Sequence, residues 1–404
     1  MRLHGVVGVL AALLLVAACS TPARAPAPPS SGSQPSAAPP GSGQASAAAP
    51  SSGQPSAAPP SSSAPSAPAA PAREPALQAL VDAARQEGAL NLVLSLEASN
   101  ETVPRWTEGF KRLYGMNLDV RYTPGPPMAE QAARIAQEAQ AGRTASSDVF
   151  IGAESHVNTL ANAGALEAVD WASWAPNVRD PGLVAPGGVA LQLATRIPGI
   201  TYNTTRLSGD AVPATLQDLL KPQYKGRIAS TPYAAGFPPL GSPEVWGEAR
   251  LVDYVTKLAD QIGGLIRCNE IDRLVSGEFD AFALDCGVEF RRAQARGSPI
   301  GHVIPSDAAT LVYWYVAVPR HAAHPAAAKL WVDYLMSREG QDILFEGEHT
   351  DHHRVPGSHV APEVEALQAR GVKFTEVDVA FVQRTDRELL NRLGAETQRI
   401  IQKQ

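Results

Sequence analysis

Two kinds of hydrophobic pattern alternate along the chain beyond residue 74. Short apolar runs, which predict buried strands, lie at 90–94, 118–122, 148–151, 199–202, 227–229, 280–284 and 313–318. Between several of them, apolar residues recur every three or four positions, which predicts helices at 76–86, 103–114, 129–141, 326–336 and 384–402. Strands that alternate with helices predict mostly parallel sheets covered by helices. The predicted fold class is therefore α/β.

The first 18 residues have the pattern of a secretory signal peptide. Arg2 supplies a positive charge, and residues 6–18 form an apolar run that is shorter than the roughly 20 residues of a membrane-spanning helix. The run ends in Val16-Ala17-Ala18-Cys19, which resembles a bacterial lipobox, so we expect Cys19 to be lipidated and to anchor the protein at the membrane surface. The alternative is an ordinary signal peptide followed by a chance cysteine.

Residues 19–75 contain almost only Pro, Ala, Ser, Gly, Gln and Thr, and the heptapeptide of residues 34–40 recurs at 54–60. This low-complexity composition cannot bury a core, and its prolines favour an extended spacer. We expect a disordered linker between the anchor and the folded part; a glycosylated stalk would serve the same purpose.

Length and charge restrict the class of the folded part. Residues 76–404 exceed the roughly 250 to 300 residues at which a single core stops growing, which favours two lobes. The chain has 34 Lys and Arg against 40 Asp and Glu, a formal net charge of −6. This excess of acidic residues argues against a nucleic-acid partner.

Candidate binding residues follow the predicted strands. In α/β sheets, ligands bind beyond the carboxyl ends of the strands, where loops and helix starts expose N–H groups. Hydroxyl, phenol and carboxylate side chains occupy these positions after four of the predicted strands: Ser95, Glu97, Ser99, Glu154, Ser155, Ser230, Thr231, Tyr233 and Asp285.

Several segments, in the same order along the chain, resemble the extracellular solute-binding proteins of bacterial ABC importers. They read GITYNT at 199–204, DLLKPQYKGRI at 218–228, GEFDA at 277–281, VPRHAAHPAAAK at 318–329 and SREGQ at 337–341. The subgroup in question includes ferric-ion-binding proteins and their relatives for phosphonates, thiamine and polyamines.

This resemblance implies a two-lobed periplasmic-binding-protein-like fold of type II. One lobe would comprise residues 76–196 plus 312–404, and the other residues 197–311. A monomer without cofactor would close over a small polar or anionic solute and deliver it to an ABC transporter permease. Binding, and not catalysis, would be the function.

The chain departs from the ferric members of this family at one place. Those members carry two adjacent tyrosines after the strand that corresponds to residues 280–284, where this chain reads Asp285-Cys286-Gly287. Paired phenolate ligands are therefore absent there. Residues 230–236 resemble the anion-binding turn of the family, whereas Asp285 and Glu97 would favour an amine or a polyol, and the sequence leaves the choice open.

Only two cysteines follow Cys19. Cys268 lies before a short predicted helix, and Cys286 lies just past the strand that follows it, so both sulfurs are expected at the same end of that strand. In an exported protein this favours a Cys268–Cys286 disulfide over two buried thiols.

The sequence leaves two other functions open. His349, Asp351, His352, His353 and His359 lie within eleven residues, and imidazole with carboxylate is a ligand set for zinc and related metals. A metal-binding receptor that uses residues 349–359 is thus an alternative. A secreted hydrolase is favoured less, because residues 76–404 contain no GxSxG, HExxH, CxxC or P-loop motif.

Overall fold

The computed structural model describes residues 75–96 and 98–403. The predicted signal peptide, Cys19 and the linker up to residue 74 lie outside these residues, and so does the candidate Glu97. Pro75, which the predicted linker included, is the first residue of a helix. None of the described helices is long and apolar enough to cross a membrane.

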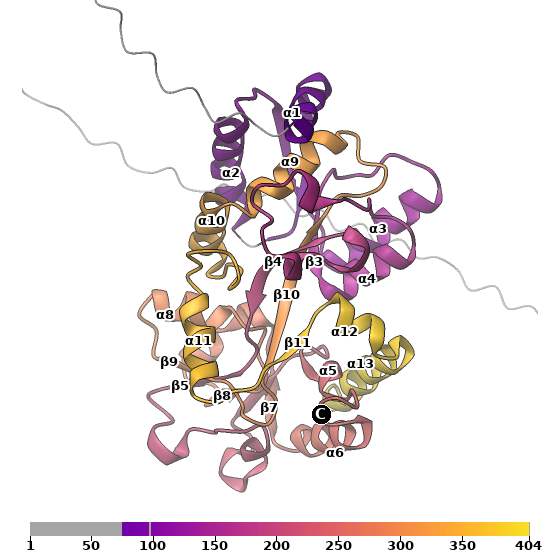
Figure 1. The fold of residues 1–404 in the computed structure, drawn as a ribbon. Coiled ribbons are helices and arrows are strands. Elements are labelled where there is room, and N and C mark those ends of the chain that lie inside the picture. Colours follow the sequence, from indigo (N-terminus) through magenta and orange to yellow (C-terminus); the bar gives the residue numbers. More distant parts are fainter. Residues whose placement is uncertain (1–74, 97, 404) are drawn as a thin grey trace, which may run out of the picture. The chain divides into compact units, whose positions relative to one another are not determined.

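Helices and strands alternate along the described chain, as the hydrophobic pattern predicts (Figure 1). The strands are β1 (Ala89–Leu94), β2 (Asp119–Pro124), β3 (Phe150–Ala153), β4 (Leu191–Arg196), β5 (Ile200–Asn203), β6 (Ile228–Ser230), β7 (Ile262–Leu265), β8 (Ala281–Phe282), β9 (Ile300–Val303), β10 (Thr310–Ala317) and β11 (Thr375–Val377). The helices are α1 (Pro75–Glu87), α2 (Ser99–Tyr114), α3 (Met128–Gln140), α4 (Glu154–Asn162), α5 (Phe237–Leu240), α6 (Glu248–Ala259), α7 (Asp272–Val275), α8 (Glu289–Ala295), α9 (Pro325–Leu335), α10 (Arg338–Glu348), α11 (Ala361–Ala369), α12 (Val379–Arg384) and α13 (Arg387–Ile401).

The helix predicted at 384–402 begins later than expected. Residues 379–384 form the separate helix α12, and Thr385 leaves the helical conformation with ψ at 142°. The Asp386 side chain then accepts a hydrogen bond from the Glu388 N–H and starts α13. Because this aspartate starts a new helix, two helices occupy the segment for which the hydrophobic pattern predicts one.

The first group of strands is built around β10. Strands β3 and β4 pair with β10 in antiparallel orientation, and β11 pairs with it in parallel. Strands β1 and β2 form a parallel pair, and a bridge between Leu92 and Val149 connects β1 to the residue before β3.

The second sheet has the strand order β7-β6-β8-β5-β9. Strand β6 is parallel to β7 and β8, whereas β5 is antiparallel to β8 and β9. The α/β class is confirmed, but the sheets are mixed and not mostly parallel. The physical reason is that β5 follows the passage from one sheet to the other and β10 follows the return: β5 runs antiparallel to β8 and β9, and β10 runs antiparallel to β3 and β4.

Separate hydrophobic clusters accompany the two groups of strands. We call the clusters around β1–β4 and β10 the first core and those around β5–β9 the second core. The chain leaves the first core at Ile197 and joins the second at Ile200. Helix α13 contributes Leu393 and Ile401 to the second core, where it packs against α5 and α6. The division into lobes stays a prediction; it assigned residues 312–404 to the lobe of residues 76–196, whereas α13 packs against the second core.

Asp148 connects three parts of the first core. Its fully buried carboxylate accepts hydrogen bonds from the Asn91 N–H (2.6 Å) and the His324 N–H (3.0 Å), and lies 2.7 Å from His324 Nδ1. These contacts attach β1 and the start of α9 to the segment that leads into β3.

Replacing this carboxylate will destabilise the fold. We expect Asp148→Ala to lower the free energy of unfolding by about 3 kcal/mol, because buried donors lose their acceptor. Asp82→Ala removes a carboxylate whose ion pair with Arg85 is about half exposed, and should cost less than about 1 kcal/mol. Urea unfolding of both variants measures the difference, and similar losses would refute the proposed role of Asp148.

Candidate functional site

A small cavity lies where elements of the two cores meet. It has a volume of about 200 Å³. Helix α4 provides four of its residues, the loop after β6 and α5 provide three, and β11, α12 and α13 provide the rest: Glu154, Ser155, Asn158, Thr159, Ala235, Pro238, Pro239, Val377, Val382, Arg387, Leu390 and Asn391. The predicted site residues Glu154 and Ser155 thus line one cavity.

Glu154 is the most perturbed carboxyl group of this cavity. It is the first residue of α4, directly after β3, and its side chain is partly buried. Burial raises its pKa to about 7, although its own backbone N–H and the charge of Arg196 act in the opposite direction; the charge of Asp378 raises it further. A carboxyl group with such a pKa, in a cavity, is typical of a functional site.

Two predicted hydroxyl groups have no hydrogen-bond partner among the described residues. Ser230 ends β6 and is fully buried, and Ser95 follows β1. The Oγ atoms of both are buried without a partner. Buried polar groups are nearly always satisfied in native proteins, so these two hydroxyls have free capacity for a bound molecule or for water.

Three other predicted residues are occupied by internal hydrogen bonds. Ser99 Oγ donates to the Leu96 carbonyl and lies 2.7 Å from the hydroxyl of Tyr122. Thr231 Oγ1 donates to the Tyr233 carbonyl, and the Tyr233 hydroxyl accepts from the Cys268 N–H at 3.1 Å. These contacts shape the strand ends.

Asp285 is satisfied within the protein as well. Its buried carboxylate accepts hydrogen bonds from the N–H groups of Gly199 (3.1 Å) and Gly287 (2.9 Å) and from Thr201 Oγ1. Burial alone would raise the pKa of Asp285, but the charge of His302 and these hydrogen bonds lower it below its ordinary value. The carboxylate therefore holds the passage between the two sheets, and little of its capacity is left for a solute.

Sequence reasoning missed Arg196, the last residue of β4. Its guanidinium lies 5.0 Å from the ring centre of Trp314 and 3.8 Å from Glu289 Oε1. Its Nε atom is buried without a partner in the described structure. Position at the carboxyl end of a strand would have marked Arg196 as a candidate, but β4 itself was not predicted.

A second pair of charges lies near Arg196. Glu348, the last residue of α10, accepts a hydrogen bond from the Ala98 N–H at 2.7 Å, and its other oxygen lies 3.4 Å from Arg292. Burial raises the pKa values of both Glu289 and Glu348, and the positive charge of Arg196 partly offsets this effect. Arg196 thus acts electrostatically on three carboxyl groups, those of Glu154, Glu289 and Glu348.

The predicted Cys268–Cys286 disulfide is present, with a Cα–Cα distance of 5.9 Å. It joins the residue that begins a short 3₁₀ turn to the loop after β8. The hydroxyl of Tyr233 lies 4.0 Å from Cys286 Sγ. The bridge therefore fixes the loop after β8 beside the loop after β6.

The histidine-rich segment does not assemble a metal site. His352 Nε2 lies 3.0 Å from Gln192 Oε1, and His353 Nδ1 lies 2.8 Å from Thr195 Oγ1. The Asp351 carboxylate accepts hydrogen bonds from Ser358 Oγ and from the His359 N–H. Burial lowers the pKa of His352 well below its ordinary value and that of His353 to about 4.

Within residues 75–96 and 98–403, the one group of ligand atoms close enough to hold a metal is Cys268, Cys286 and Glu289. Its two sulfurs are bonded to each other. The side chains of residues 349–359 instead hold their own loop against β4.

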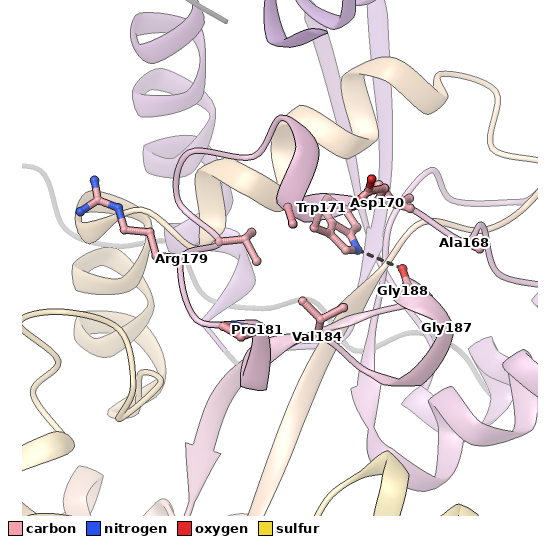
Figure 2. Close-up of a pocket in the computed structure, with 11 residues that line it drawn as sticks. Ala168, Asp170, Trp171, Arg179, Pro181, Val184, Gly187 and Gly188 are labelled. Carbon is pink, nitrogen blue, oxygen red and sulfur yellow. Dashed lines mark hydrogen bonds between the residues drawn. The ribbon is translucent and has the colours of Figure 1, made fainter.

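Figure 2 shows a larger cavity of about 510 Å³ formed by residues 168–188. Trp171 lies across it, and its indole N–H is already bonded to the Gly188 carbonyl at 2.9 Å. None of the predicted site residues lines this cavity. The smaller cavity at Glu154 is therefore the stronger candidate.

Comparisons with known proteins identify the family and the fold of the chain. Residues 146–384 match the family model described as "Bacterial extracellular solute-binding protein". The chain is 24% identical over 302 residues to a protein of Serratia marcescens named "Fe(3+)-binding periplasmic protein", an alignment that covers 68% of this chain and 85% of that protein.

Solved structures show the same fold. The substrate-binding protein of an ABC transporter from Agrobacterium tumefaciens superimposes with a TM-score of 0.64 at 20% identity, over 78% of this chain and 94% of that one. Iron-bound HitA from Pseudomonas aeruginosa superimposes with a TM-score of 0.59 at 15% identity, over 77% and 99% of the two chains.

We predict that the Cys268–Cys286 disulfide stabilises the folded protein measurably. It closes a loop between residues 18 positions apart, so we expect Cys268→Ser with Cys286→Ser to lower the free energy of unfolding by about 3 kcal/mol. Alkylation of the denatured, unreduced protein should leave both cysteines unlabelled by mass spectrometry. Labelling of either residue before reduction would contradict the bridge.

The raised pKa of Glu154 predicts that the stability of the fold depends on pH. Its pKa is higher in the folded state (about 7) than the ordinary value of 4.5, so its contribution is fully present below pH 4.5 and is lost as the pH rises through 7. Relative to Glu154→Gln, the unfolding free energy of the wild type should fall by about 1 to 2 kcal/mol over this interval, with allowance for solvent screening.

Chemical denaturation at a series of pH values measures this difference. Glu365→Gln changes an exposed glutamate without a described ion pair and should leave the profile unchanged. Parallel profiles for the wild type and Glu154→Gln would mean that Glu154 titrates normally.

Proposed function

We propose that this chain, which belongs to the family of bacterial extracellular solute-binding proteins, is the substrate-binding lipoprotein of an ABC importer. It is a binding protein of a transport system that acts outside the cytoplasm, and not an enzyme. In the proposed function it captures a small polar or anionic solute and delivers it, chemically unchanged, to a permease in the membrane.

The observation that carries the proposal is the composition of the cavity at Glu154. Glu154 and Ser155 belong to α4, which packs on β3 and β10, whereas Ala235 and Pro238 belong to the loop and helix beside the second core. A solute bound there would contact both cores at once. Such a solute favours the arrangement in which the cores are close together, which a permease can recognise.

Charged contacts between the cores support the same proposal. Arg196 on β4 faces Glu289 on α8, and Arg292 on α8 faces Glu348 on α10. Partly buried pairs of this kind are worth little net energy, but they fix the approach of the two surfaces. A solute that competes for Arg196 would change this approach.

Among the predicted residues, we propose that Glu154 and Ser155 contact the solute in this cavity. Ser95, Ser230 and Arg196 do not line the cavity, but each has a buried polar atom without a described partner, and they are further proposed contacts. Glu97, which the structure does not describe, remains a proposed contact. Ser99, Thr231, Tyr233 and Asp285 are proposed to shape the strand ends, because their polar atoms already have partners.

The proposed solute is not a ferric ion held by paired phenolates. The relative from Serratia is named for Fe(3+) binding. In this chain the place after β8 is occupied by Asp285, whose carboxylate is bonded internally, and by Cys286, which is in a disulfide. A small polar organic solute fits the serine hydroxyls, Glu154 and Arg196 better.

The remaining parts of the proposal concern residues outside the described structure. Lipidation of Cys19 would anchor the protein, as a monomer, to the cell membrane. The linker would let the folded part reach both the solute and the permease.

Ligand screening of the full chain tests the proposal. Native mass spectrometry of gently purified protein, and a thermal-shift screen of phosphonates, polyamines, sugars, thiamine-like compounds and metals, should reveal one class that raises the melting temperature saturably. A ligand at 100 times its dissociation constant stabilises by about 2.7 kcal/mol. We expect Arg196→Gln to weaken binding about tenfold, and Arg370→Gln, an exposed arginine, to have no effect.

Three results would contradict the proposal. The first is the absence of any stabilising compound, and the second is the release of a chemically altered compound. The third is a shift seen with transition metals alone and lost in His352→Ala with His353→Ala, which would favour the metal-binding alternative.

A further inference from the structure

The cavity at Glu154 carries charges of opposite sign on different helices. Glu154 stands at the start of α4, and Arg387 stands at the start of α13. Both line the same cavity of about 200 Å³, which is smaller than the roughly 300 to 1,000 Å³ of sites for drug-sized ligands. A molecule that fills this cavity therefore lies beside both residues.

Neither side chain has a charged partner in direct contact among the described residues. No other residue in the described part of the chain donates a hydrogen bond to the Glu154 carboxylate, and Arg196 acts on it without a direct contact. Arg387 likewise forms no ion pair or hydrogen bond with the described residues. The neighbouring arginines differ, because Arg384 pairs with Glu244 and Arg392 pairs with Glu248.

The wall between the two charges is apolar, with amide groups near each end. Pro238, Pro239, Val377, Val382 and Leu390 provide apolar surface. The amide groups come from Asn158, which is almost fully buried on the helix of Glu154, and from Asn391, one turn beyond Arg387. Such a wall suits a short carbon chain with a polar group at each end.

We infer that this cavity binds a small zwitterion, whose cationic nitrogen lies against the Glu154 carboxylate and whose acidic group lies against the Arg387 guanidinium. This inference rests on the proposed function and names its solute class. Each charge of the solute gains a charge-assisted hydrogen bond. A diacid would place an anion against Glu154 and a diamine would place a cation against Arg387, so both are disfavoured.

In this binding mode, helix α13 provides the ligand contact on the side of the second core. That helix packs against α5 and α6 of the second core, whereas α4 packs on β3 and β10 of the first. A zwitterion that bridges Glu154 and Arg387 would connect the two cores through its own length. A molecule with one charged end could not make this connection.

Three four-carbon compounds that differ at their ends test the inference: 4-aminobutyrate, 1,4-diaminobutane and succinate. Calorimetric titration of the full chain should show binding of 4-aminobutyrate, or of its three- or five-carbon homologue, at least tenfold tighter than that of the diamine or the diacid. Glu154→Gln and Arg387→Gln should each weaken this binding about tenfold or more. Glu365→Gln and Arg370→Gln are the matched controls and should leave it unchanged.

The results of these titrations distinguish a failure of the zwitterion inference from a failure of the proposed function. Equal or tighter binding of the diamine or the diacid, no binding of any of the zwitterions, or full affinity in Arg387→Gln would overturn the inference. The proposed function would survive each of these results if another compound of the wider screen still bound. Circular dichroism and melting curves of the variants establish that they are folded, so a loss of binding is attributable to the charge.

Discussion

The passage of the chain between the two sheets depends on one buried carboxylate, that of Asp285. It accepts hydrogen bonds from the N–H groups of Gly199 and Gly287 at the point where the chain passes from β4 to β5. Gly287 has a positive φ of 85°, and a side chain there would meet the backbone nitrogen of Ile197 at 2.6 Å. This close backbone approach, which glycine alone permits without strain, fixes where β4 ends. The position of Arg196 follows from it.

Arg196 in turn sets the electrostatics of the region. Its charge acts on the carboxyl groups of Glu154, Glu289 and Glu348, and burial raises the pKa of each of them. The charges of Arg196 and, at Glu348, of Arg292 do not fully compensate the desolvation of these three carboxyl groups, because each pKa stays raised. The region consequently has unsatisfied capacity for a cationic group, whereas an anionic group depends on Arg387 or on the free Nε of Arg196.

The sequence predicted those features that local patterns determine. Each apolar run predicted as a strand overlaps a strand of the structure. Two of the predicted binding residues, Glu154 and Ser155, line one cavity, and their contact with a solute stays a prediction. The disulfide followed from export and from the positions of Cys268 and Cys286 around one strand. Resemblance to a family supplied the two-sheet topology, which periodicity alone does not determine.

The features that sequence did not predict depend on contacts between distant residues. Asp285 follows a strand, as a ligand-binding residue would, yet its oxygens are directed to the N–H groups of Gly199 and Gly287. The histidines of residues 349–359 have the composition of a metal site, but burial against β4 gives them partners such as Gln192 and Thr195. Arg387 was not considered, because the break between α12 and α13 that brings it to the cavity depends on the cap at Asp386. Composition and spacing identify candidates, and the direction of each side chain decides among them.

Helix α13 makes the C-terminal part of the chain a third connection between the cores. Strand β11 pairs with β10 and α12 packs on α4, so this segment begins on the first core and ends on the second. Movement of one core relative to the other must therefore be absorbed at Thr385, whose extended conformation separates α12 from α13. A ligand shifts an equilibrium between two arrangements only by the difference between its affinities for them. Contacts at Glu154 alone would be nearly the same in both arrangements, because α4 and α12 move together. Ligand contacts on α13 or on the loop after β6 would differ between the two arrangements. Only those contacts could therefore favour the arrangement in which the cores are close together.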